Sequence, residues 1–152
     1  MRVRRYAPLV AVLVLGVVGT AGADGYVRDA QERVKAADWS KMQTVRVTLK
    51  EYAFSPSTLV FQAGVPYKLV ITNEGTTKHY FTAEKFFKAI ATRKVQSTDG
   101  EVKAPYFRAI EVYPGRSMEL YFIPVKTGLY NELRCTIPGH AGLGMRGQIR
   151  IE

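Results

Sequence analysis

The chain has 152 residues, of which 47% are hydrophobic and 23% are charged, and its formal net charge is +9. This size and composition fit one globular domain with a hydrophobic core, and they exclude a disordered or collagen-like chain. One cysteine excludes an internal disulfide, and two histidines exclude every site that needs three or more imidazoles.

Residues 1–23 have the pattern of a secretory signal peptide. Three arginines among the first five residues precede the apolar run Leu9–Val18, and Ala21-Gly22-Ala23 supplies the small residues of a cleavage site. An uncleaved membrane anchor is the alternative, but the run is shorter than the ~20 residues of a spanning helix. We therefore expect a periplasmic or otherwise exported protein whose mature chain has no membrane span. The pair Arg4-Arg5 does not distinguish one export route from another.

The charge that remains after cleavage bears on the choice of partner. Cleavage after Ala23 removes three of the 22 basic residues and none of the 13 acidic residues, which leaves a net charge of +6. This charge suits an acidic protein partner or an anionic membrane surface. We expect no nucleic-acid partner, because the basic residues are scattered and export separates the protein from DNA and RNA.

The mature chain begins with residues 24–43, which we predict to form a short amphipathic helix or an arm. Val27, Ala30, Val34 and Ala37 recur at helical spacing, with charged residues between them. Such a helix would either pack on the rest of the domain or project from it.

From Thr44 to Glu152, apolar and polar residues alternate in short runs, as in half-buried strands. The alternating apolar positions are Val45, Val47 and Leu49; Leu59 and Phe61; Leu69 and Ile71; Leu120 and Phe122; and Ile149 and Ile151. Turn residues such as Ser55-Pro56 and Pro114-Gly115 separate these runs. Residues 44–152 are therefore predicted to form one all-β domain, a sandwich or a barrel.

One segment within this domain is predicted to be helical. Over Thr82–Lys94, five apolar residues fall on one helical stripe, with Thr82 as a possible N-cap. The stripe consists of Ala83, Phe86, Phe87, Ile90 and Ala91. The polar stretch Gln96–Lys103 is predicted to be a loop. We therefore interpret Ala83–Arg116 as a helical insertion between strands, of unknown role.

Residue types that can bind metals are grouped near the C-terminus. Cys135, His140 and Met145 follow one another at Cys-x4-His and His-x4-Met spacing on a glycine-rich segment, and His79 lies at the start of a predicted strand. Each residue alone is also typical of a buried core or a polar loop. Together they include every histidine and the only cysteine of the chain, which favours a metal site.

The chemistry of these donors favours copper over zinc. Two imidazoles, one thiolate and a weak thioether form the ligand set that suits copper cycling between Cu(I) and Cu(II). Structural zinc sites use four firm ligands drawn from Cys, His, Asp and Glu, and a thioether binds zinc poorly. We therefore predict one copper ion.

The sequence resembles the cupredoxins, or blue copper proteins. Cys135-Thr136-Ile137-Pro138-Gly139-His140 is similar to the ligand loop of azurin, and the spacing to Met145 is closer to that of auracyanin-type proteins. Upstream, Tyr52-Ala53-Phe54-Ser55-Pro56 and Asn73-x-Gly75 match the usual approach to the first histidine. The resemblance implies a Greek-key β-sandwich in which His79, Cys135 and His140 are equatorial ligands and Met145 is the axial ligand.

The chain departs from the family pattern at three places. Tyr80 stands where many cupredoxins have an Asn or Ser that ties the ligand loops together, and Lys78 stands where azurin has Gly. The approach to the cysteine, Gly128-Leu129-Tyr130 followed by four residues, is one residue longer than usual, which a β-bulge would absorb.

These features predict a monomeric one-electron carrier that exchanges electrons with redox proteins. In this family the C-terminal histidine reaches the surface through an apolar patch, here Pro138, Ala141 and Leu143. The alternative is a periplasmic copper-binding protein for copper tolerance, buffering or delivery. An enzyme is not expected: with both histidines assigned to one copper, none remains for a second copper ion or for a hydrolytic triad.

Overall fold

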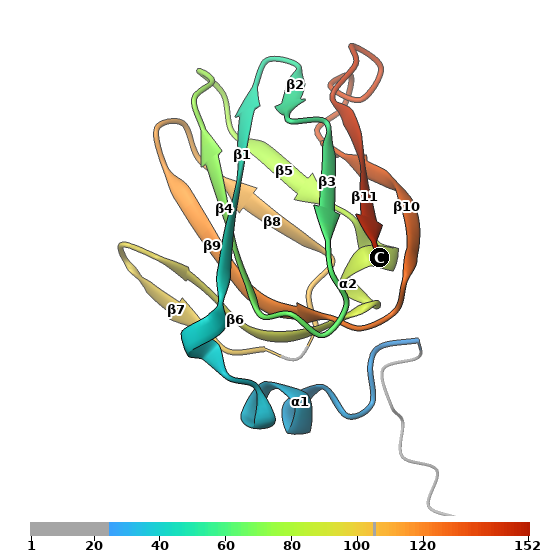
Figure 1. Ribbon diagram of the computed structural model, residues 1–152. Coiled ribbons are helices and arrows are strands. Elements are labelled where there is room, and N and C mark those ends of the chain that lie inside the picture. Colours follow the sequence, from blue (N-terminus) through green and yellow to red (C-terminus); the bar gives the residue numbers. More distant parts are fainter. Residues whose placement is uncertain (1–24, 105) are drawn as a thin grey trace, which may run out of the picture.

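The computed structural model describes residues 25–104 and 106–152 and shows two β-sheets packed face to face (Figure 1). The predicted signal peptide lies outside these residues. One sheet has the order β2-β1-β4-β9-β6-β7, and the other has the order β3-β11-β10-β5-β8. The pairs β1–β4 and β3–β11 are parallel, and the other pairs are antiparallel. The predicted all-β sandwich is confirmed.

The strands of the first sheet are β1 (Gln43–Lys50), β2 (Ala53–Ser55), β4 (Tyr67–Asn73), β6 (Ile90–Ser97), β7 (Gly100–Val102) and β9 (Ser117–Pro124). Those of the second sheet are β3 (Thr58–Phe61), β5 (His79–Thr82), β8 (Ala109–Val112), β10 (Gly128–Arg134) and β11 (Arg146–Ile151). The chain crosses repeatedly between the sheets, so strands distant in sequence become neighbours, as in a Greek key.

The core between the sheets is built from the residues that alternate along the strands. Leu49, Phe61, Leu69, Leu120 and Ile149 are fully buried, in agreement with the alternation in the sequence. Aromatic rings dominate the centre, where Phe61 and Phe122 pack edge to face with their ring centroids 5.1 Å apart. Burial of such rings is a large favourable contribution to folding.

Residues before β1 cover part of the outer face of the first sheet. They form helix α1 (Ala30–Ala36) and the 3-10 helix η1 (Trp39–Lys41). Val27 and Ala30 are buried against Ala91 of β6 and Ile123 of β9. The predicted helix is therefore present, and it packs on the sandwich at the end away from the β10–β11 loop (Figure 1). The boundary between residues 43 and 44 stays a prediction.

The helix predicted over Thr82–Lys94 is wrong. Only one turn, α2 (Glu84–Phe87), is helical, and β6 begins at Ile90. Thr82 belongs to β5 and is not the N-cap; the carboxylate of Glu132 accepts hydrogen bonds from the first N–H groups of α2 instead.

A strand was mistaken for a helix because both faces of β6 are buried. Ile90 points into the main core, whereas Ala91 faces the cluster under α1. Consecutive apolar residues on a doubly covered strand imitate a helical stripe. The segment forms a strand because it pairs with β9 in an antiparallel ladder, in which Ile90 lies opposite Pro124.

The interpretation of Ala83–Arg116 as an insertion is also wrong. The segment contributes β6 to the interior of one sheet and β8 to the edge of the other. The predicted loop Gln96–Lys103 includes the hairpin of β6 and β7, in which Gln96 pairs with Glu101. This part of the chain belongs to the sandwich itself.

Among the described residues, no helix is long and apolar enough to cross a membrane.

Candidate metal centre

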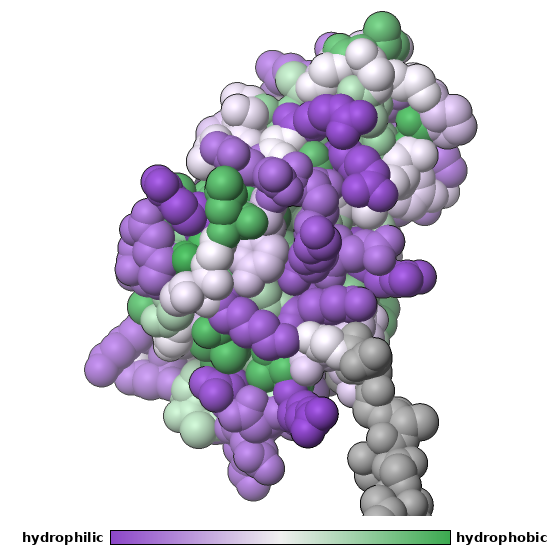
Figure 2. Space-filling model, turned by 90° about the vertical axis from the view of Figure 1, so that its right-hand side faces the viewer, coloured by the Kyte–Doolittle hydropathy of each residue, from purple (hydrophilic) through white to green (hydrophobic). Residues whose placement is uncertain are grey.

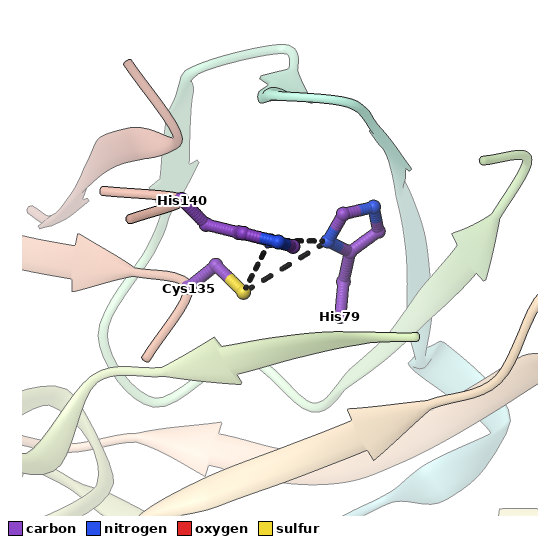
Figure 3. Close-up of side chains that lie close together, drawn as sticks. All are labelled: His79, Cys135 and His140. Carbon is purple, nitrogen blue, oxygen red and sulfur yellow. Dashed lines mark hydrogen bonds between the residues drawn. The ribbon is translucent and has the colours of Figure 1, made fainter. Parts of the chain in front are cut away.

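The fold brings three of the four predicted ligands together at one end of the sandwich. His79 is the first residue of β5, Cys135 follows the last residue of β10, and His140 lies in the loop between β10 and β11. Figure 3 shows the two imidazole rings and the thiol pointing toward a common point.

The donor atoms of these residues are close enough to share one ion. His79 Nδ1 lies 3.2 Å from His140 Nδ1, and Cys135 Sγ lies 3.8 Å and 3.5 Å from these two atoms. His79 and Cys135 are fully buried, whereas His140 is half-buried. Among the described residues this is the group of His, Cys and acidic side chains placed to hold a metal.

The spacing fits three ligands around one metal. Imidazole nitrogens bind such metals at ~2.0 Å and thiolates at ~2.3 Å, so three donors in one plane stand ~3.5–3.8 Å apart. The measured separations, 3.2–3.8 Å, agree with this arrangement. One thiolate and two imidazoles form the trigonal set that suits copper. The residues present therefore fit one copper ion.

Met145, the fourth predicted ligand, closes the same loop. It is fully buried; its N–H donates to the carbonyl of His140, and its carbonyl accepts from the N–H of Cys135. Gly139 and Gly144 have φ values of +88° and +108°, a region that L side chains avoid, and they let the loop turn back on itself. The loop thus holds the backbone of Met145 next to those of Cys135 and His140.

The predicted bulge before the cysteine is confirmed. In the ladder of β10 and β11, Tyr130 pairs with Ile149 and Leu133 pairs with Gly147. Three steps along β10 therefore match two steps along β11, so one extra residue is absorbed. Gly147 is needed here, because a Cβ atom at this position would lie 2.6 Å from the carbonyl oxygen of Ser57.

Other hydrogen bonds connect the ligand segments around His79, where the chain departs from the family pattern. The backbone N–H of Tyr80 lies 3.4 Å from Cys135 Sγ and donates to it, whereas the Tyr80 hydroxyl bonds to Glu111. The two ligand segments are tied together by the hydroxyls of Thr82 and Thr136, which lie 3.1 Å apart. The sequence prediction missed this pair.

Glu51 is a second residue that the sequence prediction missed. Its Oε1 lies 3.3 Å from Nε2 of His79. Hydrogen bonds from the backbone N–H groups of Thr77 and Thr76 lower the pKa of Glu51 to about 2. Burial lowers the pKa of His79, against the opposing effect of Glu51. At neutral pH the pair is a carboxylate beside a neutral imidazole, which is the form that binds metal.

The protein surface near His140 is partly apolar. The ring of Tyr52 packs edge-on against His140 with centroids 4.8 Å apart, and Leu143 is 63% exposed. Pro138 is also exposed, whereas Ala141 is half-buried. Figure 2 shows neutral and hydrophobic residues, white and green, at the upper end, where the β10–β11 loop lies. Tyr52 was not among the predicted surface residues.

Comparison with known proteins agrees with the fold described above. The model of the cupredoxin-like domain family matches residues 30–132. The chain belongs to this family. The matched range includes His79 but ends before Cys135, so the ligand loop follows the matched region of this cupredoxin-like chain. No curated protein sequence matches the chain significantly.

Solved structures share the fold at low sequence identity. A multicopper oxidase from Campylobacter jejuni has 16% identity and a TM-score of 0.57, over 77% of this chain and 31% of that protein. Auracyanin B has 21% identity and a TM-score of 0.50, over 72% of this chain and 88% of that protein. A copper nitrite reductase from Nitrosomonas europaea has 12% identity and a TM-score of 0.55, over 72% and 49%. The chain thus spans about a third of the oxidase, and these likenesses establish the fold.

Proposed function

We propose that the protein is an exported, monomeric one-electron carrier with one copper ion held by His79, Cys135 and His140 and with Met145 as the weaker axial ligand. The observation that carries this proposal is the convergence of two Nδ1 atoms and one Sγ atom within 3.2–3.8 Å of one another. The predicted signal peptide, residues 1–23, supports the exported location.

The protein supplies a rigid environment for this chemistry. Copper, when bound, supplies one-electron exchange between Cu(I) and Cu(II). Cys135 is fully buried, and its thiol accepts a hydrogen bond from the N–H of Tyr80. The N–H of Cys135 donates to the carbonyl of Met145. His79 is fixed at the start of β5, where it pairs with Val112 of β8. Ligands held by one hydrogen-bonded sheet and its β10–β11 loop move little when the charge of the site changes, which favours fast electron exchange.

His140 is the ligand closest to the solvent, so we propose it as the place where electrons enter and leave. It is half-buried, whereas His79 and Cys135 are fully buried. The exposed side chains of Pro138 and Leu143 lie on the same loop, with Ala141 between them, and Tyr52 packs on the ring. A partner that docks on this partly apolar rim would come close to His140.

The residue count argues against an enzyme of the kind found among the structural neighbours. The chain has two histidines and one cysteine, and all three belong to the group described above. No imidazole remains to hold a second copper ion, which a multicopper oxidase or a copper nitrite reductase needs. This supports a carrier in which a single site gains and loses one electron.

The direct test of this function is electrochemical. We expect the copper-loaded protein to give a reversible one-electron wave and rapid electron self-exchange, with copper retained in both oxidation states. Retention of Cu(I) together with loss of Cu(II) would contradict the carrier and favour the alternative role in copper tolerance, buffering or delivery.

A further inference from the structure

His79 has a second polar contact that the ligand set does not use. Its Nδ1 faces Cys135 and His140, and its Nε2, on the other side of the ring, faces Glu51 Oε1 at 3.3 Å. Nε2 is buried and has no well-aligned hydrogen-bond partner among the described residues. A buried N–H without a hydrogen-bond acceptor is costly, and the nearby carboxylate is such an acceptor.

The carboxylate of Glu51 is itself held in place by the β4–β5 loop. Its Oε1 accepts hydrogen bonds from the N–H of Thr76 at 2.7 Å, from the N–H of Thr77 at 2.8 Å and from the Thr77 hydroxyl at 3.1 Å. These three donors hold the carboxylate in place and favour its ionised form. The negative charge beside His79 is therefore fixed in position.

The loop that holds Glu51 is shaped around the carboxylate. Buried Asn73 braces the loop, because its side-chain amide donates to the carbonyl of Thr77 and its oxygen accepts from the N–H of Gly75. A Cβ atom at Gly75 would lie 2.6 Å and 2.7 Å from the two carboxylate oxygens of Glu51. Only glycine lets the loop approach the carboxylate this closely.

We propose that Glu51 is a positioning residue for the copper site, which keeps the proton of His79 on Nε2 and places a fixed negative charge behind the copper-binding imidazole. This inference rests on the proposed role of His79 as a copper ligand. A carboxylate behind a ligating imidazole fixes its tautomer and makes it a stronger donor. A negative charge near the metal stabilises Cu(II) more than Cu(I), so Glu51 lowers the reduction potential.

The main test replaces the charge and keeps the shape. In Glu51→Gln, the amide oxygen still accepts from the loop, but the charge is lost. We expect the equilibrium constant for reduction of the copper-loaded protein to rise about tenfold, the lower end of the effect of such partners on metal sites. For one electron this is about 59 mV. The measurement is a spectroelectrochemical titration.

Glu101→Gln is the matched control. Glu101 also has its pKa lowered to about 2, here by Lys103 and Lys94, and it lies on β7, away from the β10–β11 loop. Its replacement removes the same charge, and we expect an unchanged potential. Gly75→Ala is a second variant, which keeps Glu51 in the chain but displaces its carboxylate; it should also raise the potential.

A readout on the metal-free protein separates this inference from the copper-site proposal. In 1H–15N spectra of the histidines, we expect His79 to carry its proton on Nε2 in the wild type, and we expect this preference to weaken in Glu51→Gln and in Gly75→Ala. Unchanged potentials and an unchanged tautomer in Glu51→Gln and Gly75→Ala would overturn the role of Glu51. Failure of the wild type to bind copper would instead overturn the proposed function.

Discussion

Each of the residues that meet at the metal centre is held through its backbone as well as its side chain. Cys135 is tied to Met145, Met145 to His140, and the N–H of Tyr80 to the thiol. These hydrogen bonds fix the loop and β5, and the fixed backbone keeps the donor atoms close together. The same loop presents Leu143 to the solvent, which links the centre to the surface.

Leu143 gives the most direct test of where partners dock. A charged side chain at this 63% exposed position would have to be desolvated against an apolar partner surface. We expect Leu143→Glu to slow electron exchange with a redox partner about tenfold, or ~1.4 kcal/mol, with copper still bound. Stopped-flow kinetics measures the rate. Leu129→Glu, at a 58% exposed position near the start of β10, is the control, and equal rates in the two variants would contradict docking at this loop.

The single turn α2 connects β5 to β6, and the two phenylalanines on it fill the core. Phe86 is fully buried, and its ring lies 5.6 Å from that of Phe122 on β9. The ring of Phe61 on β3 stacks against that of Phe86, with the centroids 6.0 Å apart. This short helix therefore links both sheets through one side chain.

Truncation of that side chain measures its contribution. We expect Phe86→Ala to lower the free energy of unfolding by about 3–5 kcal/mol, because a cavity would open between the sheets. Urea denaturation of the metal-free protein gives the value. Val102→Ala on β7, where the side chain is 57% exposed, should change it by less than about 0.5 kcal/mol. Similar effects of the two changes would contradict the described core.

The hairpin of β6 and β7 carries an acid-sensitive ion pair. The contacts of Lys103 and Lys94 with Glu101, both at 2.8 Å, lower the pKa of Glu101 from 4.5 to about 2. A carboxyl whose pKa is lowered by folding stabilises the protein above its unfolded pKa, and this contribution disappears as the pH falls through the folded pKa.

The substitution Glu101→Gln removes this pH-dependent contribution to stability. At pH 7, Glu101→Gln should be slightly less stable than the wild type, since the group is 39% exposed and solvent screens the pair. The difference should shrink as the pH falls from about 4.5 to about 2. Urea denaturation at several pH values tests this, and a difference that grows on acidification would contradict it.

The three residues of the candidate centre could be selected from the sequence because histidine and cysteine are rare in this chain. His79, Cys135 and His140 needed no choice among candidates, and the bulge in β10 was predicted because the approach to Cys135 is one residue longer than in the family that the sequence resembles. Glu51 could not be found in this way, because it lies 26 residues before Thr77 and only the folded loop brings the two together. The strand β6 was missed because α1 covers its outer face, a contact that no local pattern reveals.

The whole molecule combines a basic charge with an apolar end. The net charge without residues 1–23 is +6, as calculated from the sequence. Electrostatic attraction would speed the encounter with an acidic partner, and salt screens it, since the Debye length falls from ~10 Å at 0.1 M to ~3 Å at 1 M. We expect electron exchange with an acidic redox protein to slow as salt rises, and exchange with a neutral small oxidant to stay constant. Equal salt dependence of the two rates would contradict an acidic partner.

The measurement that tests the account most directly is a visible absorption titration of the protein without residues 1–23 with Cu(II), repeated with Cys135→Ser. We expect an intense thiolate-to-copper band that saturates at one equivalent, bleaches with a reductant and is absent from the variant. Circular dichroism of both proteins checks that the sandwich is intact. A wild type without this band, or a band that persists in Cys135→Ser, would contradict a copper centre built on Cys135, His79 and His140.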